Sequence, residues 1–459
     1  MSPAAAALHY RKLGMPAGFG KDDSTTMAQN WSQARRLESW PPPSLSRAIA
    51  DAGSAATSTT FVARQPIYDT RMEVYGYELL FRAADESWAD VENPNEATAH
   101  TIVTTFGDIG LDTLVGGRMC FVNVTREFIL NDFVPLLPVG RVGLEMPRDI
   151  AADPDVAAKL GELGEMGYII VLDDFVMRPD SAPLLELAHM VKLDAHSFTD
   201  EQLREQIEAI AAHKVKLIGE RIESYEQFDR CKAAGLGYFQ GYFFCQPKTV
   251  AGKGIPSNRL SQVQLIAALQ NPEVTLEELD AVISRDLGVS YRLLRWINSA
   301  YFSLPRKVNS VHEALVLLGA RNVRSWAMLV TLAGLDDTPA ELTRTAMLRG
   351  KMAELVSHEL ERPDTEAYFT VGLFSVIDAF MNMRMEDVLA ELPLGPDVSL
   401  ALLQRAGPMG EVLEWVTAYE RGEFEALGEP VPAADRILRD AYVRALRFAD
   451  EACGSVVPD

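Results

Sequence analysis

The sequence predicts an α/β, TIM-like (β/α) barrel followed by an all-α helical domain, and three observations lead to this prediction. Short apolar runs alternate with amphipathic stretches between residues 61 and 250, which is typical of parallel strands joined by crossover helices. After residue 256 the strand pattern almost disappears and amphipathic helical stretches follow one another. Polar residues recur at the ends of the apolar runs, where the functional side chains of such barrels gather.

The composition is that of a globular protein and limits the classes of partner. Hydrophobic residues make up 48 % of the 459 residues and charged residues 24 %, which is ordinary. The net charge of −22 argues against a nucleic-acid polymer as a partner but not against a small phosphate ligand held by metal ions. No apolar run approaches the roughly 20 residues that a membrane span requires. The four cysteines lack CxxC spacing, so we expect reduced thiols and a cytoplasmic protein.

The first 60 residues differ from the rest of the chain. They are rich in Ala, Ser, Pro and Thr and include three consecutive prolines at 41–43. This composition is typical of a disordered tail, and the segment lacks the long apolar stretch of a secretory signal. Met15 and Met27 lie within it, so the sequence leaves the natural start of the protein open.

The elements of the barrel are expected in order along the chain. Apolar runs rich in β-branched and aromatic residues predict strands at 61–69, 74–82, 119–125, 142–147, 168–172, 189–194, 215–220 and 238–239. Apolar residues at helical spacing predict helices at 95–108, 154–166, 200–213 and 225–234. Because strands and helices alternate, we expect a parallel barrel.

The region after the barrel is expected to be helical throughout. Turn residues, such as Asn271-Pro272 and Gly407-Pro408, separate its amphipathic stretches. We expect helices at 259–270, 276–285, 289–297, 310–335, 339–360, 365–380 and 432–451, with shorter ones between 386 and 427. The chain therefore divides into a tail at 1–60, a barrel at 61–250 and a helical domain at 251–459.

Eight polar side chains lie within or at the end of the apolar strands: Glu78, Asn123, Glu145, Asp173, Asp174, Lys192, Glu220 and Gln240. Strand ends of a parallel barrel converge on one rim. Clustered carboxylates repel one another unless cations lie between them, and carboxylate and Asn oxygens suit Mg²⁺ or Mn²⁺. Two such ions could clamp a phosphodiester and activate a water molecule. Lys192 could hold or deprotonate that water, or neutralise the charged transition state.

Residues 61–247 resemble an EAL domain, the family of cyclic di-GMP phosphodiesterases. The signature Glu-x-Leu-x-Arg is present at 78–82, after Gln65-Pro66. Further matches are the Asn strand at 121–125, Asp173-Asp174-Phe175, Lys192-Leu193-Asp194, the region 219–223 and Gln240-Gly241-Tyr242.

The resemblance implies a role for each polar residue. Metal ions would be bound by Glu78, Asn123, Glu145, Asp173, Asp174 and Glu220. Lys192 and Gln240 would position water. Arg82 would contact a phosphate and Gln65 a guanine.

Two segments depart from the family pattern. After Asp-Asp-Phe the family continues Gly-Thr-Gly-Tyr-Ser-Ser, whereas this chain has Val-Met-Arg-Pro-Asp-Ser at 176–181. Val176 adopts the left-handed backbone conformations that are accessible to Gly only at a cost in free energy, and Pro179 stiffens the loop. After Glu145 the family has Leu-Thr-Glu, and here Arg148 stands in place of the acid. The family's dimerisation involves the first of these loops, so a homodimer is left open.

Residues 258–427 resemble an HDOD domain, a relative of HD hydrolases that lacks the metal-binding His and Asp. The stretches 289–304 and 308–326 carry the resemblance. Ser375-Val376 follow the place where an HD site would need His-Asp, and His312 and His358 are isolated. We therefore assign no catalysis to this domain, and a protein partner is implied by the resemblance alone.

Three functions stay open on this basis. The first is a cyclic di-GMP-linked signalling protein whose barrel binds the nucleotide through divalent metals, with weak or absent hydrolysis because of the loop after Asp173-Asp174. The second is an active cyclic di-GMP phosphodiesterase. The third is a nucleotide-independent interaction scaffold. The sequence names neither the pathway nor the partner.

Overall fold

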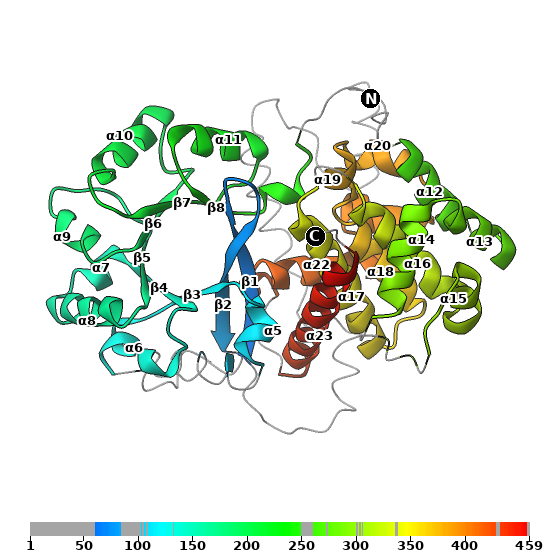
Figure 1. Ribbon diagram of the computed structural model, residues 1–459, viewed down its shortest axis with the longest axis horizontal. Coiled ribbons are helices and arrows are strands. Elements are labelled where there is room, and N and C mark those ends of the chain that lie inside the picture. The colour runs from blue at the N-terminus through cyan, green and yellow to red at the C-terminus, as the bar shows by residue number, and fades with distance from the viewer. Residues whose placement is uncertain are drawn as a thin grey trace, which may run out of the picture.

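The computed structural model describes residues 60–83, 109–131, 133–248, 260–271, 274–299, 306–335, 338–427 and 432–456, together with single residues at 102, 105, 106, 302 and 304. A barrel occupies one half of the molecule and helices occupy the other (Figure 1). The predicted tail and most of the helix predicted at 95–108 lie outside the described residues, and the proposed domain boundaries remain a prediction.

Eight strands close into a barrel in chain order, which confirms the predicted fold class. They are β1 (Thr60–Asp69), β2 (Val74–Ala83), β3 (Met119–Asn123), β4 (Val142–Pro147), β5 (Ile169–Asp173), β6 (Met190–Asp194), β7 (Lys216–Glu220) and β8 (Tyr238–Gln240).

One strand departs from the predicted parallel arrangement. β1 pairs antiparallel with both β2 and β8, whereas the other neighbours are parallel. The connection between β1 and β2 is a short turn in which the Asp69 carboxylate accepts hydrogen bonds from the N–H groups of Arg71 (2.8 Å) and Glu73 (3.0 Å). A turn this short can only join antiparallel strands, since a parallel pair needs a crossover connection.

Helices cover the outside of the barrel. They are α5 (Leu111–Val115), α6 (Arg126–Leu130), α7 (Arg148–Ala151), α8 (Pro154–Glu165), α9 (Ala182–Leu185), α10 (Asp200–Ile210) and α11 (Tyr225–Ala234). Side-chain caps mark the starts of α6, α8, α10 and α11. Asp153 accepts from the N–H groups of Asp155 and Val156 at the start of α8, and Thr199 forms a capping box with Gln202 at the start of α10.

The second region is helical, as predicted. It contains α12 (Leu260–Gln270), α13 (Leu276–Ser284), α14 (Leu287–Ile297), α15 (Val311–Leu318), α16 (Ala320–Ala333), α17 (Ala340–Glu359), α18 (Thr365–Phe374), α19 (Ile377–Met381), α20 (Met385–Ala390), α21 (Pro396–Gln404), α22 (Gly407–Glu420) and α23 (Pro432–Val456). Two stretches predicted as single helices are divided. Gly319, at φ 84°, separates α15 from α16, and Val376, at φ −130°, separates α18 from α19. No described helix has the length and apolarity of a membrane span.

The last two helices pack against the barrel (Figure 1). β8 pairs only with residues 67–69 of β1, so the earlier part of β1 has an edge that no strand in the described part of the chain covers. There the N–H groups of Val62 and Arg64 donate to the hydroxyls of Tyr419 on α22 (3.3 Å) and Tyr442 on α23 (3.0 Å). Two tyrosines thus satisfy backbone groups that an exposed edge would leave open.

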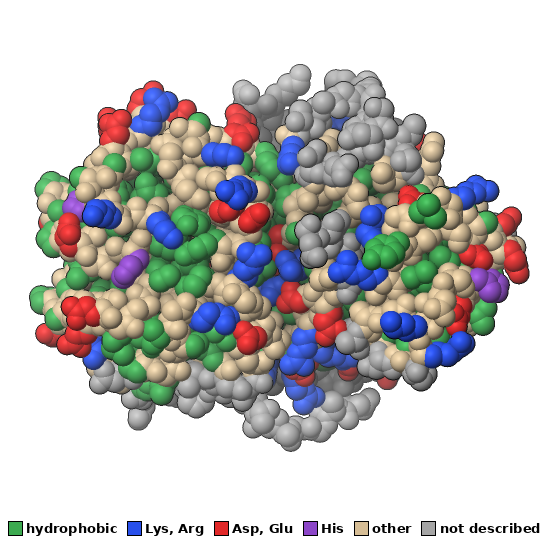
Figure 2. Space-filling view, viewed as in Figure 1, with side chains coloured by type: hydrophobic (Ala, Val, Ile, Leu, Met, Phe, Trp, Pro, Cys, Tyr) green, Lys and Arg blue, Asp and Glu red, His purple; other side chains and the backbone are tan. Residues whose placement is uncertain are grey.

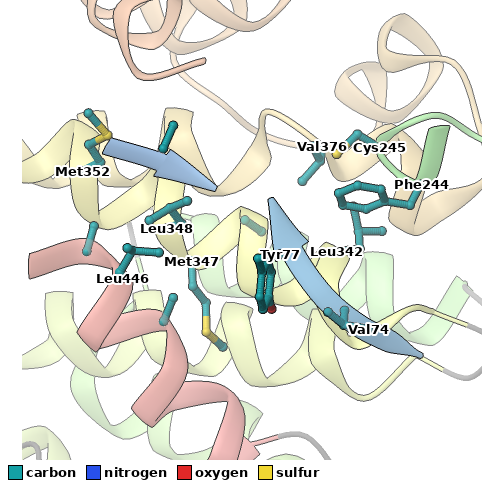
Figure 3. Packing of buried hydrophobic residues seen from close by; sticks show 14 of the residues in the cluster. Val74, Tyr77, Phe244, Cys245, Leu342, Met347, Leu348, Met352, Val376 and Leu446 are labelled. Carbon is teal, nitrogen blue, oxygen red and sulfur yellow. The ribbon is translucent and has the colours of Figure 1, made fainter. Parts of the chain in front are cut away.

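Charged side chains hold the same junction together. Arg64 pairs with Asp450 (3.1 Å), which also pairs with Arg344 (2.7 Å). The Tyr77 hydroxyl donates to Glu341 (3.0 Å), and the ring of Tyr77 lies near apolar side chains of α17 (Figure 3). Basic and acidic side chains are interspersed along this junction on the face shown in Figure 2. Because side chains alternate along a strand, Arg64 and Tyr77 face the helices while their neighbours Gln65 and Glu78 face the barrel interior.

Candidate functional site

The alternation of strand side chains places the polar residues in one layer inside the barrel. A buried apolar layer of Ile67, Phe121, Val171, Met190 and Ile218 fills the interior. Two positions along the same strands, in the same inward direction, lie Gln65, Asn123, Asp173, Lys192 and Glu220. Hence a polar layer stands directly on an apolar layer.

The centre of the polar layer is Lys192, which is almost completely buried. Its ammonium Nζ lies 2.7 Å from Glu78 Oε2 and 2.8 Å from Glu145 Oε2. Burial alone would lower the pKa of Lys192, but the charges of Glu145 and Glu78 outweigh it and raise that pKa. In the metal-free site Lys192 therefore keeps its proton at neutral pH, and its N–H groups are suited to hold a water molecule or a negative charge.

Glu78 joins the largest number of these contacts. Its carboxylate accepts hydrogen bonds from Asn123 Nδ2 (2.6 Å), Gln240 Nε2 (2.6 Å) and Lys192. Burial would raise the pKa of Glu78, but the charge of Lys192 and these three hydrogen bonds lower it. Gln240 Nε2 also donates to Gln65 Oε1 (2.8 Å). The structure thus brings together six residues that the sequence singled out.

A second acidic group adjoins this centre. Glu220 is 8 % exposed, and burial together with the charge of Asp173 raises its pKa to about 8. Burial, partly offset by Lys192, also raises the pKa of Asp173. Burial and the charge of Glu78 raise the pKa of Glu145 well above its ordinary value. These raised pKa values indicate that the carboxylates lie too close together for the positive charge that the described residues place among them.

Two predicted site residues are not brought into this layer. The Asp174 side chain is 60 % exposed and pairs with Arg221 (3.4 Å) instead. Arg82 lies on β2, but its side chain lies outside the described residues.

The donor set fits a hard divalent cation. Three buried carboxylate oxygens, Glu145 Oε1, Asp173 Oδ1 and Glu220 Oε1, accept no hydrogen bond within the described part of the chain. Once ionised, a carboxylate oxygen can only accept, so such atoms then call for a cation or water. Among the described residues, no three His, Cys, Asp or Glu side chains already stand at metal-ligand spacing. Some of these side chains would therefore move in order to share an ion.

The loop after Asp174 has an anchor that sequence reasoning missed. Arg148, the base that replaces the family's acid, pairs with Asp180 (2.6 Å) and donates from Nε to Ser181 Oγ (3.3 Å). The N–H of Met177 donates to Gln206 Oε1 (2.6 Å). Both departures from the family pattern thus contact each other. The signal was available, because one departure introduces a base and the other an acid.

The raised pKa of Glu220 predicts a pH dependence. In the folded protein Glu220 holds its proton up to about pH 8, whereas its ordinary value is 4.5. Between these values the folded state binds more protons than the unfolded state, so the free energy of unfolding falls as pH rises. Glu220→Gln should reduce this slope by up to about 1.4 kcal/mol per pH unit.

Urea unfolding in the presence of a chelator, from about pH 5 to pH 8, measures this slope. Glu165→Gln, at the exposed end of α8, removes one carboxylate without touching the site. Equal slopes for Glu220→Gln and the unaltered protein would contradict the prediction.

A barrel with a buried acidic rim, joined to a bundle of helices, is thus the class of protein that fold and site define. The sequence model of the EAL domain family matches residues 123–247, and that of the HDOD domain family matches residues 255–393. The chain carries an EAL domain followed by an HDOD domain. The EAL match begins after Gln65 and Glu78, yet the structure places both in the polar layer.

Two relatives extend over most of the chain. The "Uncharacterized protein YuxH" of Bacillus subtilis is 28 % identical over 398 residues, covering 84 % of this chain and 97 % of its own length. The "Cyclic di-GMP phosphodiesterase CdgJ" of Vibrio cholerae is 28 % identical over 393 residues, covering 84 % and 90 %.

Solved structures are more distant. The BlrP1 manganese/cyclic di-GMP complex of Klebsiella pneumoniae is 16 % identical with a TM-score of 0.36 and covers 42 % of this chain. This chain spans 56 % of the length of that one. The EAL enzyme Bd1971, in its cAMP- and cyclic di-GMP-bound form, is 16 % identical with a TM-score of 0.35, covering 52 % and 70 %.

Proposed function

We propose that this protein acts in cyclic di-GMP signalling, that its barrel binds the nucleotide together with Mg²⁺ or Mn²⁺, and that hydrolysis is weak or absent. The observation that carries the proposal is the buried polar layer, in which three carboxylate oxygens accept no hydrogen bond from the described residues. The cyclic di-GMP phosphodiesterase CdgJ of Vibrio cholerae is among the relatives. The expectation of a cytoplasmic protein, drawn from four cysteines that lack CxxC spacing, belongs to the same proposal.

The residues of the chain would divide the work as follows. Glu78, Asn123, Glu145, Asp173 and Glu220 would hold the ions, with Asp174 joining them from the rim. When bound, divalent ions supply positive charge at the phosphodiester and lower the pKa of a bound water. Lys192 would donate a hydrogen bond to that water or to a phosphate oxygen. Gln65 and Gln240, which already contact each other, would orient the base and the water.

The loop after Asp174 is the reason to expect slow chemistry. Phosphodiester hydrolysis depends on holding the reacting groups in line. Here Val176 stands where the family has Gly, Pro179 stiffens the loop, and the Arg148–Asp180 pair ties the loop to the end of β4. Such a loop can support binding of a ligand without reaching the geometry of the transition state. Because the loop is altered, a homodimer remains a proposal. A protein partner of the HDOD domain is likewise a proposal.

Full catalysis is the second candidate, and the complete polar layer favours it. Every metal ligand and water-positioning residue that the EAL resemblance implies is present in the chain.

Calorimetry with the full chain, Mn²⁺ and cyclic di-GMP tests binding, and chromatography of the same mixture after several hours tests turnover. We expect binding with little or no linear product. Glu78→Ala should abolish binding, whereas Glu165→Ala on the exposed end of α8 should bind as the unaltered chain does. Rapid conversion to linear product would favour the second candidate. No binding at all would overturn both and leave the nucleotide-independent scaffold.

A further inference from the structure

Arg221 lies at the mouth of the barrel directly after Glu220, the last residue of β7. Its backbone has φ 56°, in the left-handed region that residues other than Gly adopt at an energetic cost. The side chain is 58 % exposed, and its guanidinium reaches two carboxylates, with Nη1 lying 3.1 Å from Asp194 Oδ2 and Nη2 3.4 Å from Asp174 Oδ1.

Asp174 is unusual in the same way. Its φ of 45° is also left-handed, and its carboxylate is turned to the rim, where it meets Arg221. Two residues in costly conformations, at the ends of β5 and β7, therefore face each other. Such conformations persist when surrounding contacts hold them. The ion pair is one such contact.

Two positive charges of the described site lie at different depths. Lys192 lies inside, between Glu78 and Glu145. Arg221 lies outside, and the acids around it are Asp174, Asp194 and the neighbouring Asp173 and Glu220. A guanidinium does not lose its proton in proteins. Because Arg221 contacts Asp174 Oδ1, a divalent ion that binds Asp174 meets this positive charge and competes with it.

We propose that Arg221 is a tethered cation that competes with a divalent ion for Asp174, and that it thereby weakens the outer metal position, the one at the rim that includes Asp174. Arg221 is thus a positioning residue that holds Asp174 at the rim. The inference rests on the proposed metal binding. Exposed ion pairs are weak, so displacement of Arg221 lowers the affinity for the outer ion without preventing its binding.

Titration with Mn²⁺, with free Mn²⁺ followed by its electron paramagnetic resonance signal, tests this inference without nucleotide or turnover. In Arg221→Gln the weaker class of Mn²⁺ sites should tighten about three- to tenfold, as expected for the loss of two exposed ion pairs. Arg221→Lys, which keeps the charge, should tighten less. Arg204→Gln, an exposed position on α10, removes the same net charge and should leave binding unchanged.

A double variant separates direct competition from long-range charge. In Asp174→Asn, the further change Arg221→Gln should no longer tighten Mn²⁺ binding. If Arg221→Gln and Arg204→Gln tighten binding equally, or if Arg221→Gln leaves it unchanged while Mn²⁺ still binds, the inference is wrong and the proposed function stands. If neither the unaltered chain nor any variant binds Mn²⁺, metal binding by the barrel is overturned as well. Circular dichroism of each variant checks the fold.

Discussion

Lys192→Met should lower the free energy of unfolding of the metal-free protein by about 3–5 kcal/mol, the usual cost of removing one partner from a buried ion pair. Lys192 is 1 % exposed and contacts two carboxylates, of which Glu145 is fully buried. Without the ammonium, Glu78 and Glu145 would lie close together with no cation between them. Urea unfolding in the presence of a chelator measures the effect.

Two comparisons make this prediction specific. Lys214→Met removes an exposed lysine before β7 and should change stability by less than about 0.5 kcal/mol. Adding Glu145→Gln to Lys192→Met should recover part of the loss, because one buried negative charge is then absent. A Lys192→Met protein as stable as the unaltered chain would show that the acids are neutral without Lys192.

Arg349→Met should also destabilise the protein by about 3–5 kcal/mol. Arg349 on α17 and Glu420 on α22 are both buried. Arg349 Nε and Nη2 contact the Glu420 carboxylate, the latter at 3.3 Å, and Nη1 donates to Ser375 Oγ (3.3 Å). From the barrel, the Tyr242 hydroxyl donates to the backbone carbonyl of Glu420 (3.0 Å). The pair therefore lies where helices and barrel meet.

The exposed pair Arg384–Asp387 (2.9 Å) provides the control, and Arg384→Met should cost less than about 1 kcal/mol. The double variant Arg349→Met with Glu420→Leu should recover most of the lost stability, because apolar side chains can replace a buried ion pair. Thermal and urea unfolding measure all three proteins. If the double variant is no more stable than Arg349→Met, packing rather than charge determines the loss.

Much of the barrel could be predicted because its signals are local. The bounds predicted for strand β4 and for helix α11 are those that the structure shows. The convergence of strand ends in a barrel was enough to bring Glu78, Asn123 and Lys192 to one rim. The antiparallel direction of β1 was missed, although a four-residue connection to β2 contained the reason. Gly319, which divides the stretch predicted as one helix, is a similar local signal.

The contacts at the site and at the junction of barrel and helices come from residues far apart in the chain. Arg221 and Asp174 are 47 positions apart, and Arg349 and Glu420 are 71 apart. The spacing of apolar residues within a single helix or strand cannot reveal such a pair. Asp174 was expected among the metal ligands, yet in the fold it faces Arg221 at the rim. Likewise, the sequence showed only that Arg148 replaces an acid of the family pattern, whereas the fold shows that Arg148 pairs with Asp180.

From its residues alone, this chain could be assigned a barrel, a helical domain and an acidic rim, because apolar period and strand alternation depend only on near neighbours. Which of the rim acids is buried, which is paired and which cation neutralises it depended on closure of the barrel, which brings side chains of separate strands together. Burial and distance between charges determine pKa and ion pairing, and both exist only once the chain has folded.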